Sequence, residues 1–391
     1  MSKHQIIQDN ENKISGDRLS PLLPSKKEDA YRYFKFDYSK LNPNPGQLTQ
    51  PKPNTNQTSI FENSLIFKEN SKFTINSDVF DNFDFSASSS DFFIDRIYKN
   101  KSNRIGIRIA QSIPNETPED DVVVLDLTEI QFDVENPIHI AIHAEKHSKG
   151  TLIIKWAENR PESELIKSGL LNLILQNGAN LKIQSVQCLS AKTDAFIRTQ
   201  AHLENNAVLE LNLFQFGGHK TQNRVIANLA GHHSLLSIEA LQVANQNQTI
   251  DLNLEANHLS PDTKSTMICT NIVDDHAETV FNGLINITEK ATRSSAHQTN
   301  KNILLNEYAS AYALPKLEID TDEVECSHGS STSTLDPEQI YYLNTRGVPE
   351  KEARQMLIDG HAFPLIDKIK HQNTKLFLQD YFANKTGLSN G

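Results

Sequence analysis

The two side chains best suited to metal chemistry are a cysteine and a histidine near the C-terminal end of the chain. Cys326 and His328 lie in the segment LEIDTDEVECSHGSSTSTL, residues 317–335. They are two positions apart, so on an extended strand both side chains point to the same side. A thiolate and an imidazole on one face are suitable ligands for iron or an iron–sulfur unit, and Gly329 lets another backbone approach closely. Two ligands are fewer than a closed site needs, so the others would come from a second chain; a core cysteine beside a polar histidine is the simpler alternative.

Other histidines recur at spacings that suggest a metal site only on a helix. His139, His143 and His147 are four residues apart, but the first two lie in the strand-like segment IHIAIHA. On a strand, His139 and His143 would stand about 13 Å apart, too far for one ion. We therefore interpret them as strand and turn histidines, and His232 and His233 as polar turn residues.

The motifs of common enzymes are absent from the sequence. It contains no phosphate-binding GxxxxGK[ST] loop, no GxGxxG and no GxSxG elbow, so nucleotide hydrolysis would require another chain and we expect no enzyme activity. Cys188, Cys269 and Cys326 are far apart and have no CxxC spacing. This excludes a disulfide framework and favours a reduced compartment.

Charge and hydropathy exclude two further classes of protein. The net charge of −11 and the pI of about 5.7 argue against nucleic-acid binding. No apolar run approaches the roughly 18 residues that cross a bilayer, and the N-terminus MSKHQIIQDNENK lacks the apolar region of a secretory signal. We therefore expect a soluble cytoplasmic protein without a membrane partner.

Short β-branched and apolar segments with period-two alternation fill the middle of the chain and predict an all-β body. The clearest predicted strands are 122–127, 138–144, 151–157, 171–176, 180–188, 195–203, 207–216, 234–244, 249–259, 265–273 and 278–287. A β-sandwich or barrel would need more hairpin turns than the sequence offers, whereas a stacked β-helix suits the long monotonous array. The pattern leaves both architectures open.

The composition divides the chain into three parts. Residues 1–60 are rich in Asn, Gln, Pro, Lys and Ser and predict a flexible, partly helical arm. Residues 61–335 form the β body, and residues 336–391 form a helical domain. In that domain Asp336 predicts a helix N-cap before a proline. The first helix would end at Gly347, a second would run from Pro349 to Gly360, and a third, amphipathic stretch would follow from Ile366 to Phe382.

The segment around the Cys–His pair resembles a known family. Residues 313–347 are similar to the C-terminal signature of the SufB/SufD family of iron–sulfur cluster assembly proteins: a P-x-LEI strand, an acidic stretch, a CSHG box, Leu-Asp and a Y-L-x-x-RG helix. Residues 280–305 and the segment LPSKKEDAYRYF near the N-terminus also resemble this family, so the similarity spans 23–363. At Ala309, where SufB members carry a sulfur-accepting cysteine, this chain has none, and it resembles the SufD branch.

The resemblance implies a mainly β fold: a right-handed parallel β-helix core with helical N- and C-terminal segments. It implies a scaffold that pairs with a SufB-like subunit, where His328 falls on the histidine proposed to ligate iron or the nascent cluster and Cys326 is its neighbour. The cluster would be transient and shared with SufB, with no permanently bound cofactor. A SufC-like ATPase would dock on the C-terminal helical domain, where the expected partner-binding residues are Asp336, Tyr341, Arg346, Met356 and Phe363.

Two rival functions come from other classes. One is a β-helical enzyme that acts on polysaccharides; such enzymes are commonly exported, and the missing signal peptide and the CSHG box count against it. The other is a β-helical binding module without metal chemistry. Replacement of His328 would leave the function of such a module unchanged.

Overall fold

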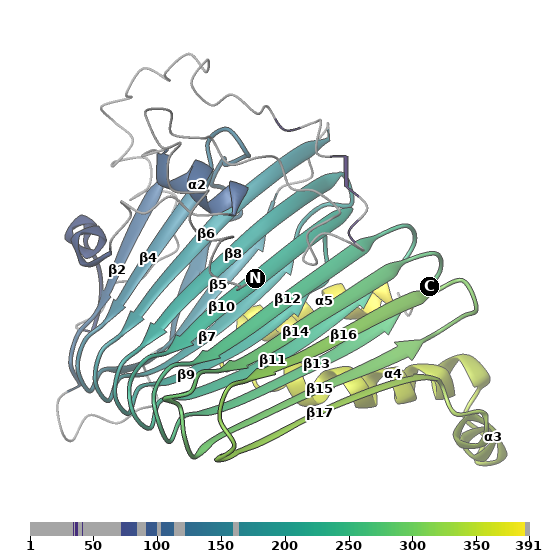
Figure 1. Ribbon diagram of the computed structural model, residues 1–391. Helices are drawn as coiled ribbons and strands as arrows, with labels where there is room; N and C mark the ends of the chain where they lie inside the picture. Colours follow the sequence, from purple (N-terminus) through teal and green to yellow (C-terminus); the bar gives the residue numbers. More distant parts are fainter. Residues whose placement is uncertain are drawn as a thin grey trace, which may run out of the picture.

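The computed structural model describes residues 72–83, 91–99, 103–112, 122–158 and 164–387, together with Phe34, Phe36, Asp37 and Leu41. Apart from those four residues, the predicted N-terminal arm lies outside the described residues. The described chain is a parallel β-solenoid of about seven turns with helices at its C-terminal end. Figure 1 shows its strands stacked from β2 at one end to β16 and β17 at the other.

The strands alternate along the chain between two sheets, and each strand pairs in parallel with the strand two positions away in the chain order. In spatial order, the nine-stranded sheet contains β1 (Phe73–Ile75), β2 (Arg104–Ile109), β4 (Ile138–Ala144), β6 (Leu165–Leu175), β8 (Thr193–Leu203), β10 (Lys220–Leu229), β12 (Thr249–His258), β14 (Glu278–Ile287) and β16 (Ser310–Ile319). The eight-stranded sheet contains β3 (Val122–Asp126), β5 (Lys149–Ala157), β7 (Asn180–Cys188), β9 (Val208–Gln215), β11 (Leu235–Ala244), β13 (Lys264–Val273), β15 (Ser294–Leu304) and β17 (Val324–Thr334). Among the described strands, only β1 joins antiparallel, against β2.

The predicted β-helix is confirmed, and the alternative of a sandwich built from hairpins is wrong. The parallel register explains why the sequence offers few hairpin turns, since each strand leaves for the opposite sheet before it returns one turn higher. The apolar interior lies between the two sheets and includes Ile140, Leu173, Leu211 and Leu252, all fully or almost fully buried. Period-two alternation in the sequence thus corresponds to an inner and an outer face on every strand.

The corners between the sheets are stacked turns that need residues with positive φ. His147 (φ 58°), Asn206 (φ 56°) and His233 (φ 57°) occupy this conformation at equivalent corners. The N–H of Asn206 donates to the carbonyl of His232 in the next turn at 2.9 Å. His147 and His233 are therefore turn residues, as the sequence predicted, and the backbone bonds between turns satisfy donors that the sheets do not use.

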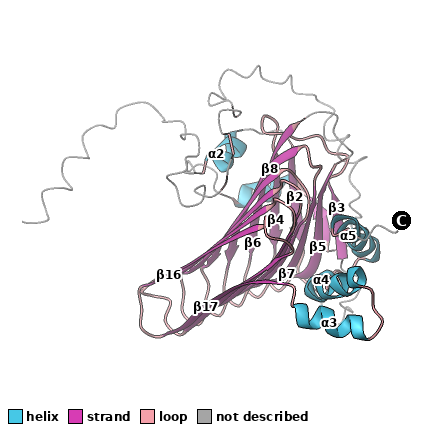
Figure 2. Ribbon diagram, turned by 90° about the vertical axis from the view of Figure 1, so that its right-hand side faces the viewer, coloured by secondary structure: helices cyan, strands magenta, loops and turns pink. Residues whose placement is uncertain are grey.

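Helices cover parts of the outer faces of both sheets. Figure 2 shows the C-terminal helices beside the sheet that contains β5 and β7. The outer face of the other sheet carries α2 and the described N-terminal residues: Phe36 packs edge-on against Phe196 of β8 at 4.9 Å. The helical segments are η5 (Ser77–Asn82), α2 (Phe92–Lys99), α3 (Pro337–Thr345), α4 (Glu350–Ile366) and α5 (Gln372–Lys385).

The first two C-terminal helices begin where the sequence predicts, but the second ends later than predicted, and the third, α5, begins at Gln372 and not at Ile366. Asp336 caps α3, and its side chain accepts a hydrogen bond from the N–H of Glu338. The prediction that the second helix stops at Gly360 is wrong, since α4 continues to Ile366 with Pro364 inside it. Beyond Gly360 the helix buries Ala362, Leu365 and Ile366 in an apolar cluster on the outer face of the eight-stranded sheet. This burial outweighs the cost of about 1 kcal/mol for a glycine inside a helix.

Candidate functional site

The solenoid ends in two strands whose outer edges pair with no other described strand. β16 is the last strand of one sheet and β17 the last of the other. From Ser327 to Thr334 every residue of β17 is exposed. Long edge strands of this kind offer free backbone N–H and C=O groups to a strand of another chain. This end of the molecule is therefore where an additional strand could pair with the sheets.

Cys326 and His328 lie on this terminal strand. They align with Ala296 and Gln298 of β15. Cys326 is partly buried and packs against the apolar interior, and its burial raises the pKa of the thiol. Because side chains alternate along a strand, His328 shares the inward side with Cys326, and it is exposed at the open end. No atom lies within 4 Å of the position that a Cβ would take on Gly329, so there is room for another chain here.

In the described part of the chain, no group of three or more His, Cys, Asp or Glu side chains could hold a metal ion. His139 is buried, with its Nε2 2.6 Å from the Oδ1 of Asn172. Burial lowers the pKa of His139 to about 4. The structure thus brings Cys326 and His328 to one face, and it does not join the other sequence-predicted histidines into a site.

The residues expected to bind a partner on the C-terminal helices differ in exposure. Tyr341 of α3 is 71% exposed and Met356 of α4 is 53% exposed. Arg346 ends α3, and its guanidinium lies 5.3 Å from the ring centre of Tyr342. Phe363 of α4 instead packs against the ring of Phe382 at 5.9 Å. Tyr341 and Met356 are thus open to solvent, whereas Phe363 helps to attach α4 to the rest of the helical layer.

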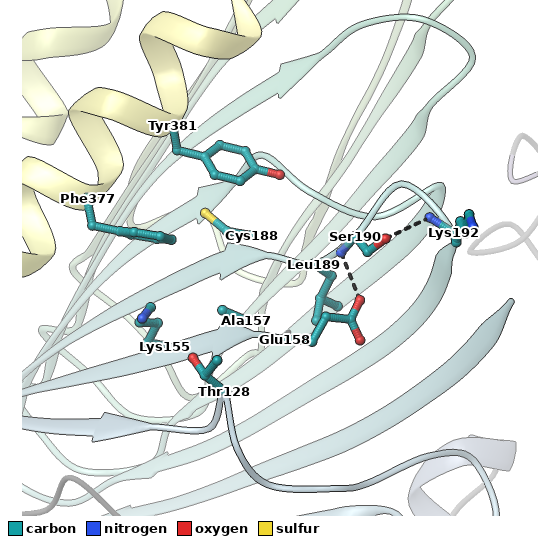
Figure 3. Close-up of a pocket in the computed structure, with 10 residues that line it drawn as sticks. All are labelled: Thr128, Lys155, Ala157, Glu158, Cys188, Leu189, Ser190, Lys192, Phe377 and Tyr381. Carbon is teal, nitrogen blue, oxygen red and sulfur yellow. Dashed lines mark hydrogen bonds between the residues drawn. The ribbon is translucent and has the colours of Figure 1, made fainter. Parts of the chain in front are cut away.

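A cavity of about 630 Å³ lies between α5 and the outer face of the eight-stranded sheet. Figure 3 shows Phe377 and Tyr381 of α5 reaching over Cys188 of β7. The Nζ of Lys155 lies 2.9 Å from Asp126 and 4.5 Å from the centre of the Phe377 ring. Burial raises the pKa of the Cys188 thiol, so this group stays protonated near neutral pH. No sequence pattern predicts this cavity, because its walls come from strands and a helix that are far apart in the chain.

The family profile described as "SUF system FeS cluster assembly, SufBD core domain" matches residues 133–361. This is more than half of the chain and contains most of the solenoid with Cys326 and His328. The chain belongs to the SufBD core domain family.

Individual relatives agree with this assignment. The chain is 32% identical to the iron–sulfur cluster assembly protein SufD of Escherichia coli over 180 residues, which cover 46% of this chain and 43% of that protein. It is 25% identical to SufD of Bacillus subtilis over 248 residues, covering 63% of this chain and 57% of the relative. A SufBD family protein of Synechocystis is 35% identical over 136 residues, or 35% of this chain and 29% of the relative. The matches span about half the length of the first two relatives.

The family assignment supports a role in iron–sulfur cluster assembly. In the described residues, the longest helices are too short or too polar to cross a membrane.

Proposed function

We propose that this chain is a cytoplasmic, non-ATPase scaffold subunit that resembles SufD and builds iron–sulfur clusters together with a SufB-like subunit and a SufC-like ATPase. The observation that carries the proposal is the position of His328. It lies with Cys326 on the inward side of the last strand, at an end of the solenoid that no described element covers. The cluster is the product of the assembly and leaves the complex, so it is not a resident cofactor.

The SufB-like subunit pairs with the open end of the solenoid. The edges of β16 and β17 supply backbone donors and acceptors along ten and eleven residues. Two exposed apolar side chains of β16, Tyr312 and Ile319, add surface that a partner would bury. The open space at Gly329 allows the partner backbone to approach β17.

His328 and Cys326 contribute to iron or cluster binding at that interface. An imidazole and a thiolate fit iron and iron–sulfur units, but two ligands leave the metal under-coordinated. The SufB-like partner supplies the remaining ligands, so binding requires the heterodimer. The Cys326 thiol must lose its proton on binding, which a metal ion promotes.

The ATPase docks on the C-terminal helices, and this role rests on their exposed apolar side chains. α3 has no buried residue and exposes Tyr341 and Tyr342. Met356 of α4 is exposed as well. Exposed aromatic and methionine side chains are enriched at protein interfaces. ATP-driven motion would act through residues 336–387 on the shared interface.

The test is co-expression of this chain with the SufB-like and ATPase subunits of the same organism, affinity purification, and the visible absorbance of the eluate after supply of iron and sulfide. We expect a ternary complex with iron–sulfur absorbance. A protein that purifies alone and colourless under these conditions would overturn the assembly role and favour a binding module that shares only the fold.

A further inference from the structure

The interior of the solenoid changes from apolar to polar directly beneath His328. One column of aligned, inward-facing positions runs through β11, β13, β15 and β17. Its members are Ile238, Met267, Gln298 and His328. Ile238 and Met267 are fully buried in the apolar core. Gln298 therefore occupies a position at which the preceding turns place apolar side chains.

The amide of Gln298 is buried without a hydrogen-bond partner. The residue is 2% exposed, and neither its Nε2 nor its Oε1 has a partner among the described residues. Asn300, two positions further along the same face, is also buried. A buried polar group without a partner costs about 1–3 kcal/mol, and such groups are rare. A partner for the Gln298 amide must therefore be a group other than the described residues as they stand in this structure.

The opposite sheet leaves space for this amide. A Cβ built on Gly283 of β14 would lie 2.3 Å from the Oε1 of Gln298, so the glycine leaves room for the amide in this position. In the last turn, Gly283 aligns with Pro315 and Gln298 aligns with His328. The space that holds the amide is thus immediately below the histidine, in the same column.

We propose that Gln298 is a positioning residue for His328, an inference that rests on the proposed role of His328 as an iron ligand. The amide oxygen of Gln298 accepts a hydrogen bond from the imidazole nitrogen that does not face iron. Histidine ligands almost always pass their second ring N–H to an acceptor, which fixes the tautomer and the orientation of the ring. Paired strands are about 4.8 Å apart, so an aligned glutamine reaches the imidazole above it. The amide gains its partner when the interface forms and the ring is held against iron.

Replacement of Gln298 by methionine tests this role. Met267 occupies the same column one turn below, so methionine fits in size and polarity. We expect Gln298→Met to have a free energy of unfolding no lower than that of the wild type, because it removes an amide without a partner. It should assemble with the SufB-like and ATPase subunits, yet form clusters about tenfold more slowly, since the loss of such an acceptor commonly costs that much. Gln298→Glu keeps an acceptor oxygen and should restore most of the rate.

Gln242→Met is the matched control. Gln242 is also buried in this sheet, but its Nε2 donates to the Oε1 of Gln215 at 2.8 Å. This variant should lower stability, because it leaves the Gln215 amide unpaired, and should leave cluster formation per folded complex unchanged. Gln298→Met should thus slow cluster formation without a loss of stability, and Gln242→Met should lower stability without slowing cluster formation.

Full cluster formation by Gln298→Met would overturn the positioning role, and so would failure of Gln298→Glu to restore the rate of cluster formation. A loss of stability in Gln298→Met equal to that of Gln242→Met would also overturn it, because it would assign the Gln298 amide to a structural water. His328→Ala separates this inference from the proposed function. If His328→Ala is defective while Gln298→Met is fully active, only the positioning role fails. If His328→Ala forms clusters normally, the ligand role fails, and the positioning role fails with it.

Discussion

Lys385 and Asn245 are joined by two hydrogen bonds that run in opposite directions. The Nζ of Lys385 donates to the Oδ1 of Asn245 at 2.8 Å, and the Nδ2 of Asn245 donates to the main-chain carbonyl of Lys385 at 2.9 Å. Lys385 is the last residue of α5, and Asn245 lies in the turn between β11 and β12. The Nζ also donates to Gln248 in the same turn. The last helix is thereby fixed to a corner of the solenoid.

This contact predicts a pH-dependent stability. Burial lowers the pKa of Lys385 to about 7, while the charge of Asp275 opposes the shift. Below pH 7 Lys385 is protonated in both the folded and the unfolded state, so it adds no pH dependence to the free energy of unfolding. Between pH 7 and about 10.5 the unfolded chain carries the extra proton, so the free energy of unfolding rises with pH by at most about 1.4 kcal/mol per unit. Urea unfolding at pH 6, 7, 8 and 9 measures this contribution.

Lys385→Met supplies the comparison for that experiment. The variant should lose the part of the slope between pH 7 and pH 9 that Lys385 contributes. Equal slopes in the variant and the wild type would show that the lysine keeps its ordinary pKa in the folded protein.

If His328 is an iron ligand, its replacement should slow cluster formation without unfolding the protein. His328 is exposed at the open end, so His328→Ala should change the free energy of unfolding by less than about 0.5 kcal/mol. The heterotrimer should still assemble, but cluster formation, followed by absorbance, should fall severalfold or more. His297→Ala is a control on the neighbouring strand, because His297 points outward and is 2.8 Å from Ser327. A normal rate in His328→Ala would exclude the histidine as a ligand.

The exposed helical surface predicts a selective loss of the ATPase. The double variant Tyr341→Ser with Met356→Ser removes two side chains that are 71% and 53% exposed. The fold and the SufB-like partner should be retained, since neither residue packs in the core, and the ATPase should no longer co-purify. Leu376→Ser, on the next helix and 47% exposed, serves as the control. Retention of the ATPase by the double variant would move its docking surface elsewhere.

A buried ion pair predicts a large stability effect at the start of α2. The Nε of Arg198 donates to the Oδ2 of Asp91 at 2.9 Å, while the Oδ1 of Asp91 accepts from the N–H of Phe93. Burial opposes ionisation of Asp91, but the charges of Arg198 and Arg224 hold its pKa below the ordinary value. Asp91→Ala should cost about 3–5 kcal/mol, because it leaves a buried arginine charge.

Chemical denaturation of a double-mutant cycle measures this coupling. Asp91→Ala combined with Arg198→Met should be less destabilised than the sum of the two single variants. Additive losses would show that the two side chains do not depend on each other.

The strands that the sequence pattern predicted and the strands that it did not predict differ in the side chains that they bury. The segments 138–144, 180–188 and 278–287 coincide with β4, β7 and β14, because apolar side chains alternate along them. The strands β10 and β15 were not among those predicted from the sequence. The inward side of β15 carries Gln298, Asn300 and Asn302, so its alternation of apolar and polar residues is lost. Asn302 is satisfied only by neighbours one turn away: its Oδ1 accepts from Asn271, and its Nδ2 donates to Thr332.

α2 was also missed, for a related reason. Its sequence FFIDRIYK is short and flanked by polar residues, and it is helical where it packs on the solenoid. Ile94 and Ile97 contact Leu170 of β6. Helices of this length are marginal by themselves and depend on tertiary packing. This segment is therefore helical because it packs against residues more than seventy positions away in the sequence.

For the candidate site, the sequence alone determined that Cys326 and His328 share one side of a strand, since side chains alternate on any extended backbone. It also determined the family, through the motif around them. Only the tertiary structure decided that this strand is the last of its sheet, that it stands above an unpaired Gln298, and that Gly283 of the opposite sheet makes room for that amide. These relationships depend on the register between successive turns of the solenoid. Register is set by the packing of the whole core and the stacking of its corners, and no local stretch of sequence contains it.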